Sequence, residues 1–129
     1  MKVFVGDSRV TKSPRVLIVD CSVESREVLR TILELRGAAT LETDRPEEAC
    51  QLAKQFRPDL IVLDADSART ASLAATSQLR EAAGLTDTPI VILGTLSRPN
   101  GELPAGQILA KPYHYGTLIR RIDDLLAAA

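Results

Sequence analysis

Uninterrupted runs of apolar residues alternate along this chain with segments in which apolar residues recur at helical spacing. The clearest run, residues 60–63, reads Leu-Ile-Val-Leu, and Asp64 follows it directly. Four apolar residues without polar alternation, two of them β-branched, are typical of a parallel strand that is buried on both faces. The same pattern predicts strands over residues 15–20 and 89–93, and weaker strands over residues 39–43 and 107–110.

Helices are predicted between and after these strands. After the first strand, apolar residues have helical spacing at Val28, Leu29, Ile32, Leu33 and Leu35. In the next helical segment, up to residue 56, the positions expected to be buried are Ala49, Leu52, Ala53 and Phe56. In the last segment, residues 115–128, they are Leu118, Ile119, Ile122, Leu125 and Leu126. An Ala-rich helix is also predicted over residues 67–83.

Residues that start and stop helices flank the first two helical segments. Ser22 is suited to cap the first, and Gly37 is suited to end it. Before the second, Asp44 is predicted as the N-cap, with Pro46 in the first turn and Glu47 completing a capping box. The boundaries of both helices are therefore predicted from polar and turn-forming residues as well as from periodicity.

Strands that alternate with helices predict a parallel sheet covered on both faces. We expect one α/β domain over residues 15–129, a flavodoxin-like doubly wound (βα)5 fold with strand order 2-1-3-4-5. The least apolar strands, residues 39–43 and 107–110, are expected at the edges. Prolines and glycines interrupt residues 94–106, so the fourth helix is predicted to be short or missing. Residues 1–14 are predicted to be an N-terminal arm.

Composition narrows the classes of protein to consider. The chain has 129 residues and is 45% apolar, with two Phe, two Tyr and no Trp, so the predicted core is aliphatic. The net charge of −1 gives no electrostatic support for nucleic acid or an anionic membrane as a partner. Without a membrane-length apolar stretch or a signal-peptide core, we expect a cytoplasmic protein. Cys21 and Cys50 are expected to be free thiols.

Chemically useful side chains follow the predicted strands. Asp20, Asp64, Thr95 and Lys111 all come at or just after a strand end, and parallel strands end at one edge of the sheet. A carboxylate can attack a phosphoryl group to form an acyl phosphate, and a second carboxylate can help to hold Mg²⁺. Lysine and hydroxyl groups can balance the charge on phosphoryl oxygens. The set therefore favours phosphoryl chemistry, without a Gly-rich nucleotide loop.

Four motifs in order resemble those of bacterial response-regulator receiver domains, the CheY-like family. They are Val16-Leu17-Ile18-Val19-Asp20, Arg57-Pro58-Asp59-Leu60-Ile61-Val62-Leu63-Asp64, Pro89-Ile90-Val91-Ile92-Leu93 and Leu109-Ala110-Lys111-Pro112. The resemblance covers residues 15–128. It implies a two-component receiver that takes a phosphoryl group from a histidine kinase or phosphotransfer protein onto Asp64, with Lys111 on the phosphoryl group. Such a domain is a phosphoacceptor with, at most, autophosphorylation and autodephosphorylation activity.

The predicted metal site departs from the family pattern. The family has two adjacent acids after the first strand, whereas here Cys21 follows Asp20. Mg²⁺ prefers oxygen ligands, and a thiol is mostly protonated at neutral pH. Asp66 is a candidate to compensate, because the family places a backbone carbonyl of that position on the metal. The predicted Mg²⁺ ligands are therefore Asp20, Asp64 and Asp66.

The predicted switch also departs from the family pattern. Gly94 takes the place of the family's hydroxyl residue, with Thr95 one position later, and Leu109 or Ile108 takes the place of its aromatic partner. These departures favour an alternative function, a pseudo-receiver that binds a protein partner independently of phosphorylation. A third possibility is a small flavodoxin-like enzyme or cofactor binder. The cognate kinase, the output partner and the oligomeric state are not predicted.

Structural roles are open for the same residues. Asp20 or Asp64 could cap the helix that follows it, and Lys111 could be an ordinary ion-pair partner of Asp64. Cys21 is expected to fill space, and His114 to lie on the surface. The charged positions of the first helix are expected to form a solvated face; they are Glu24, Arg26, Glu27 and Arg30.

Overall fold

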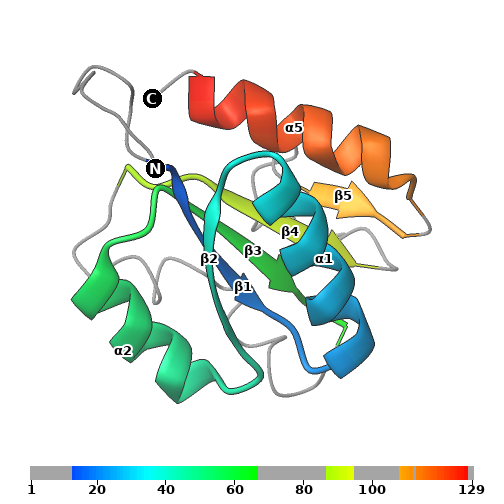
Figure 1. Ribbon diagram of the computed structural model, residues 1–129. Helices are drawn as coiled ribbons and strands as arrows, with labels where there is room; N and C mark the ends of the chain where they lie inside the picture. The colour runs from blue at the N-terminus through cyan, green and yellow to red at the C-terminus, as the bar shows by residue number, and fades with distance from the viewer. Residues whose placement is uncertain (1–12, 67–86, 95–107, 112, 128–129) are drawn as a thin grey trace, which may run out of the picture.

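Five parallel strands form a single sheet with helices on both faces in a computed structural model of the chain (Figure 1). The structure describes residues 13–66, 87–94, 108–111 and 113–127. The strands are β1 (Arg15–Val19), β2 (Ala39–Thr43), β3 (Leu60–Asp64), β4 (Ile90–Gly94) and β5 (Ile108–Ala110). The helices are α1 (Val23–Leu35), α2 (Pro46–Phe56) and α5 (Tyr115–Ala127).

The order of the strands is β2-β1-β3-β4-β5, which confirms the predicted doubly wound topology. The two least apolar strands, β2 and β5, are the edges, as predicted. The predicted helix over residues 67–83, the predicted short or missing fourth helix and residues 1–12 of the predicted arm lie outside the described residues. Across the described ranges, no helix is both long and apolar enough to cross a membrane.

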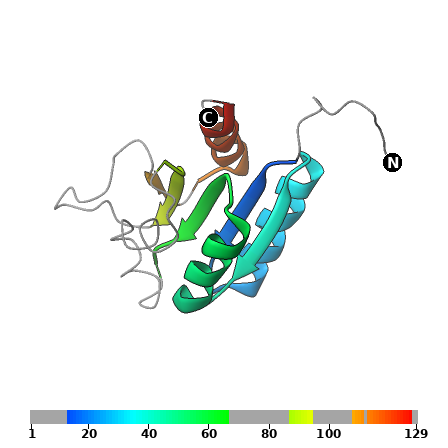
Figure 2. The ribbon, with the colours of Figure 1, turned by 90° about the vertical axis from the view of Figure 1, so that its left-hand side faces the viewer.

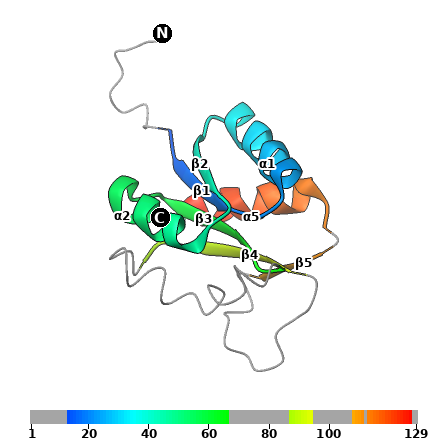
Figure 3. The same ribbon diagram turned by 90° about the horizontal axis from the view of Figure 1, so that it is seen from below.

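Alternate residues of the three central strands point to opposite faces of the sheet, and both faces are covered (Figures 2 and 3). On one face the strand residues pack against Ala49 and Ala53 of α2; these strand residues are Leu17, Val19, Ile61, Leu63, Ile90 and Ile92. On the other face, residues of α1 and α5 pack against Val16, Ile18, Leu60, Val62, Val91 and Leu93. Cover on both sides explains why the strands read as continuous apolar runs.

Helix α1 buries a narrower stripe than its apolar spacing suggested. Leu29 and Leu33, four residues apart, are buried, and Ile32 packs beside them. Val28 and Leu35, which belong to the same apolar series, are 39% and 82% exposed. The angle of about 100° between successive helical residues turns both of them away from the sheet. In α5, the predicted residues Leu118, Ile119 and Ile122 are buried, while Leu125 and Leu126 are partly buried.

The first turn of α1 agrees with the prediction, whereas that of α2 does not. Ser22 caps α1 by accepting a hydrogen bond from the Ser25 N–H at 3.1 Å. The N-cap of α2 is Arg45, not Asp44, and its side chain makes no capping hydrogen bond. Pro46 is the reason, because proline favours the first helical position and therefore makes residue 45 the cap. The capping box predicted for Asp44 does not form.

Gly37 ends α1 with a backbone angle φ of +92°, which confirms the predicted glycine stop. A Cβ atom added at Gly37 would meet nothing within 4 Å, and the same is true at Gly116 in the first turn of α5. The two glycines therefore differ in backbone conformation and not in the space around them. Only the position at Gly37 disfavours a residue with a side chain.

We expect the two alanine substitutions to change stability in opposite directions. Gly37→Ala should lower the free energy of unfolding by about 1 to 2 kcal/mol, because a left-handed backbone is unfavourable for alanine. Gly116→Ala should raise it by about 0.5 kcal/mol, because alanine is the better helix former. Urea denaturation of the two variants measures both effects. A stabilising Gly37→Ala substitution would contradict the role assigned to Gly37.

Candidate functional site

The register of the sheet brings two carboxyl groups to the same level at its carboxyl edge. Val19 of β1 pairs with Leu63 of β3, so the residues that follow them, Asp20 and Asp64, are neighbours. Both are buried, with 1% and 8% of their surface exposed. Ionised carboxylates are unfavourable in such positions unless other groups compensate their charge. The contacts of these two residues therefore define the candidate site.

Lys111 is the cation at Asp64. The Lys111 N–H donates to the Gly94 carbonyl at 2.8 Å, which holds the end of β5 beside β4. Its ammonium nitrogen Nζ lies 2.9 Å from Asp64 Oδ2 and 3.0 Å from Asp66 Oδ2. The other Asp64 oxygen, Oδ1, accepts a hydrogen bond from the Asp66 N–H at 2.9 Å. The structural alternative for Lys111, an ion pair with Asp64, is thus confirmed as a contact.

The electrostatics of Lys111 favour its charged form. Burial, the largest single cause, would lower its pKa, but the hydrogen bonds to Asp64 and Asp66 and the charges of these two carboxylates together raise the pKa above the ordinary value. The Lys111 side chain is 28% exposed and that of Asp64 is 11% exposed. The ion pair therefore lies at the sheet edge and is partly open to solvent.

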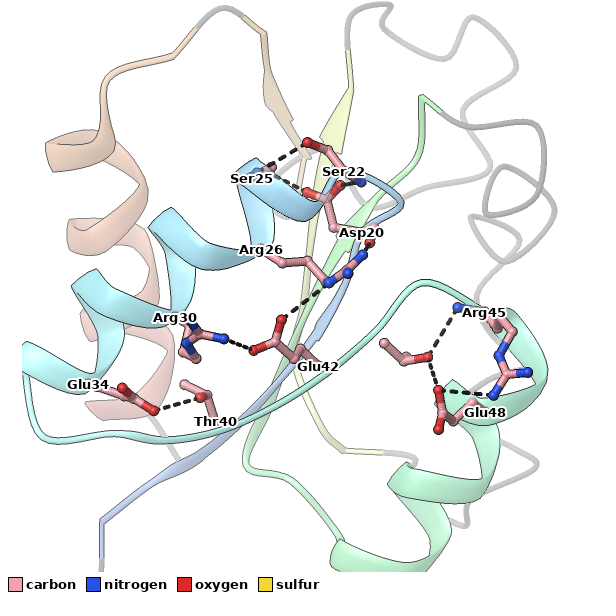
Figure 4. A network of polar contacts seen from close by, with 11 residues as sticks. Asp20, Ser22, Ser25, Arg26, Arg30, Glu34, Thr40, Glu42, Arg45 and Glu48 are labelled. Atoms are coloured by element: carbon pink, nitrogen blue, oxygen red, sulfur yellow. Dashed lines mark hydrogen bonds and ion pairs between the residues drawn. The ribbon is translucent and has the colours of Figure 1, made fainter.

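The Asp20 carboxylate is held by the first turn of α1 (Figure 4). The Ser22 N–H donates to Oδ1 at 2.8 Å, and the Ser25 hydroxyl donates to Oδ2 at 2.6 Å. Burial raises the pKa of the Asp20 carboxyl, the two serine hydrogen bonds lower it, and the charge and a hydrogen bond of Asp64 raise it again. The net pKa is raised. Asp20 therefore has part of the predicted structural role, because it orders the start of α1.

The donor set fits a magnesium ion that retains water molecules. Asp20 and Asp64 present hard carboxylate oxygens, and their mutual repulsion, which contributes to the raised pKa of Asp20, is what a divalent cation would relieve. Within the described residues, no group of three or more His, Cys, Asp or Glu residues is arranged to hold a metal ion. Mg²⁺ commonly binds one or two carboxylates and keeps several waters, so two acids suffice.

Cys21 adds no oxygen ligand to this set. Its sulfur lies 3.7 Å from the carbonyl oxygen of Asp44, in the connection between β2 and α2, and the residue is half-buried. A thiol is a weak hydrogen-bond donor and a poor ligand for Mg²⁺. Cys21 and Cys50 are both free thiols, as predicted.

The switch positions are described only in part. Gly94 is buried at the end of β4, and Leu109 of β5 is buried. The aliphatic side chain predicted at Leu109 is therefore part of the core on the α1 and α5 face. Thr95 lies outside the described residues.

Tyr113 is an aromatic residue near the site that sequence reasoning missed. It packs against the core beside α1 and α5. Its ring and that of Tyr115 are arranged edge to face, with their centroids 5.6 Å apart. Burial, the largest cause, raises the pKa of Tyr113 to about 12, and the charges of Lys111, Asp20 and Asp64 also act on it. Its position two residues after Lys111 was the sequence signal that could have placed Tyr113 near the site. His114 beside it is exposed, as expected.

The predicted solvated face of α1 was wrong for Arg26, while Arg30 is solvated but also forms an ion pair. Arg26 and Arg30 both form ion pairs with Glu42 of β2, at 3.2 Å and 2.6 Å. The Arg26 side chain is only 15% exposed. Glu24 and Glu27 are exposed, as expected. The spacing of Arg26 and Arg30 placed them on one side of α1, but only the pairing of strands brings Glu42 beneath them.

Comparison with known proteins agrees with this fold. Residues 16–123 match the response regulator receiver domain family. The protein PilH of Pseudomonas aeruginosa is 29% identical over 118 residues, which are 88% of this chain and 98% of PilH. Response regulator MprA of Mycolicibacterium vanbaalenii is 33% identical over 117 residues, covering 87% of this chain and 50% of MprA. The chain therefore spans half the length of that relative.

The fold is also found in solved structures. The signal receiver domain of a signal transduction histidine kinase from Syntrophus aciditrophicus is 26% identical, with a TM-score of 0.78 over 91% of this chain and 92% of that one. The family match over most of the chain, the doubly wound sheet and the acidic edge with its lysine lead to one assignment. The chain belongs to the response-regulator receiver domain family of two-component systems.

Proposed function

We propose that Asp64 is the phosphoacceptor of this receiver domain. The proposal rests mainly on one observation, the contact between Asp64 and Lys111 beside the buried Asp20 at the carboxyl edge. Receiver domains in general interact with histidine kinases or phosphotransfer proteins. Such a partner would be the phosphoryl donor here, and a phosphohistidine would be the reacting group.

In the proposed reaction a carboxylate oxygen of Asp64 attacks the phosphorus atom of phosphohistidine. An O–P bond forms as the P–N bond breaks, and the ring nitrogen that loses phosphorus takes up a proton from solvent. The products are an acyl phosphate on Asp64 and a neutral imidazole on the donor. Catalysis of such a transfer depends on positioning and on compensating the charge of the phosphoryl oxygens. No other covalent step is required of this chain.

Lys111 is proposed to bind a phosphoryl oxygen. An ammonium group has three donors, and two of them are directed at Asp64 and Asp66. The raised pKa keeps the group charged throughout the neutral range. When a phosphoryl group joins Asp64, the ammonium can remain beside it and compensate the added negative charge. Thr95 is proposed to donate its hydroxyl to the same group, because it directly follows the end of β4.

Asp20, Asp64 and Asp66 are proposed to hold Mg²⁺. Asp20 and Asp64 supply adjacent carboxyl groups, and Asp66 lies close enough to contact the same lysine as Asp64. When bound, Mg²⁺ supplies positive charge that compensates the phosphoryl oxygens. The second acid of the family pattern is replaced by Cys21, so the site has one carboxylate fewer and should bind Mg²⁺ weakly.

A pseudo-receiver that binds its partner without phosphorylation is the second candidate function. The thiol at Cys21 favours it, because its sulfur contacts the Asp44 carbonyl and adds no ligand for Mg²⁺. The pair of Asp64 and Lys111 favours the phosphoacceptor, since a domain that no longer transfers phosphoryl groups has no need of it. The two functions differ in one measurable property, which is formation of the acyl phosphate.

We expect acetyl phosphate to phosphorylate the protein in a Mg²⁺-dependent reaction. Intact-mass spectrometry should show a single phosphoryl adduct that disappears when EDTA removes the metal. Asp64→Asn should abolish the adduct, because an amide cannot act as the nucleophile. Asp124→Asn, which changes an exposed acid on α5, is the matched control and should leave the adduct unchanged.

The opposite result would support the pseudo-receiver. If the folded protein forms no adduct at high Mg²⁺ concentration, Asp64 is not a working phosphoacceptor. An adduct that persists in Asp64→Asn would place the phosphoryl group on another residue and contradict the proposal directly.

We also expect that Cys21→Asp strengthens the binding of Mg²⁺ by about tenfold, because it adds a carboxylate to the ligand set. Cys21→Asn is the control with the same shape and no charge, and it should bind Mg²⁺ as weakly as the wild type does. A magnesium titration followed by NMR measures both. Equal affinities for Cys21→Asp and Cys21→Asn would show that position 21 does not face the metal.

A further inference from the structure

Arg26 connects three parts of the molecule in one contact network (Figure 4). It belongs to α1, and its guanidinium nitrogen Nη1 donates to the main-chain carbonyl oxygen of Asp20 at 2.6 Å. Its Nε donates to Glu42 of β2 at 3.2 Å. Only 15% of the side chain is exposed, so these contacts are partly shielded from water. A single side chain therefore joins the end of β1 to the neighbouring edge strand.

The carbonyl oxygen of Asp20 has a special position in the chain. It lies where β1 has ended and α1 has not yet begun, so it belongs to neither regular element. The Asp20 N–H donates to the Thr43 carbonyl at 3.0 Å, and the two serines hold the carboxylate. With the Arg26 contact, the main-chain N–H, the main-chain carbonyl and the carboxylate of Asp20 are each hydrogen-bonded. The orientation of the buried carboxylate is thus constrained through its own backbone.

Arg30 supports this network from one turn further along α1. Arg30 Nη1 donates to Glu42 Oε2 at 2.6 Å, and Arg26 Nε donates to the other carboxylate oxygen, Oε1. Glu42 therefore lies between two guanidinium groups, which fixes the carboxylate that in turn orients Arg26. Arg30 shares with Arg26 the contact to Glu42, whereas the contact to the Asp20 carbonyl belongs to Arg26. The two arginines form a matched pair for experiment.

We propose that Arg26 is a positioning residue for the metal-binding carboxylate of Asp20. This inference rests on the proposed function, because it assigns Asp20 to Mg²⁺. Arg26 donates to the main-chain carbonyl of Asp20, and through it would hold the Asp20 backbone in the orientation from which the carboxylate faces Asp64. Groups that orient metal ligands from behind in this way commonly affect metal affinity by about 10- to 100-fold. The orientation of Asp20 should matter more here than in receivers with two acids after the first strand, because Cys21 leaves Asp20 as the remaining acid directly after β1.

The test compares Arg26→Met with Arg30→Met. Methionine keeps an unbranched apolar stem and removes every donor, so each variant loses one ion pair to Glu42, but only Arg26→Met loses the contact to Asp20. Magnesium affinity, measured by NMR titration, should fall about tenfold or more in Arg26→Met and by less than about threefold in Arg30→Met. Hydrogen exchange of the Ser22 amide, which donates to Asp20, should be faster only in Arg26→Met. This second measurement needs no metal.

Each result has a definite consequence. Equal losses of affinity and equal exchange rates in the two variants would overturn the positioning role and leave the proposed function intact. If the wild type binds no Mg²⁺, the proposed metal site fails, and the Ser22 exchange rates still decide whether Arg26 orders Asp20. Should Arg26→Met not fold, Arg26→Lys and Arg30→Lys replace the pair. Lysine keeps the charge, but one ammonium cannot reproduce the contacts of Arg26 to both the Asp20 carbonyl and Glu42. Magnesium affinity should therefore again fall more in Arg26→Lys than in Arg30→Lys.

Discussion

Two buried carboxyl groups placed side by side, Asp20 and Asp64, are the constraint on which the rest of this site depends. The register of β1 and β3 puts them at one level, and burial makes their charges unfavourable unless other groups compensate them. The surrounding contacts provide that compensation: Lys111 and the Asp66 N–H at Asp64, and serine donors at Asp20. The Lys111 ammonium contacts two carboxylates, those of Asp64 and Asp66, and the Asp20 carboxylate interacts with Asp64.

The position after Asp20 shows how this balance can be altered without changing the fold. A cysteine there leaves the sheet, the helix start and the Asp64–Lys111 pair in place, while the site loses a hard ligand. The remaining Asp20 carboxylate is held by polar contacts to its side chain and to its backbone. Arg26 and Glu42 belong to those contacts, and they join α1 to the edge strand β2. In the proposed metal site, one arginine would therefore couple metal binding to the packing of that edge of the sheet.

Much of the fold could be predicted because the buried strands are recognisable from short stretches of sequence. An apolar run such as residues 60–63 is buried on both faces, and an acid directly after it must lie at the carboxyl edge. The N-cap of α2 was wrong because proline at position 46 determined the first helical residue more strongly than the acid at position 44 could. Arg26 was missed because its partner Glu42 is 16 residues away and becomes a neighbour only when β2 pairs with β1. Spacing along a helix carries no information about such a partner.

Binding of beryllofluoride, a phosphoryl analogue that joins to carboxylates, tests most directly whether the Asp64 edge is a phosphoacceptor site. Fluorine NMR of the protein with beryllofluoride and Mg²⁺ should show bound fluorine signals, and the amide signals of Asp64 and Lys111 should shift in the same titration. Asp64→Asn should show neither change. If the folded wild-type protein gives no bound signal at saturating Mg²⁺, the carboxyl edge does not accept a phosphoryl group, and the assignment of Asp64 as phosphoacceptor is contradicted.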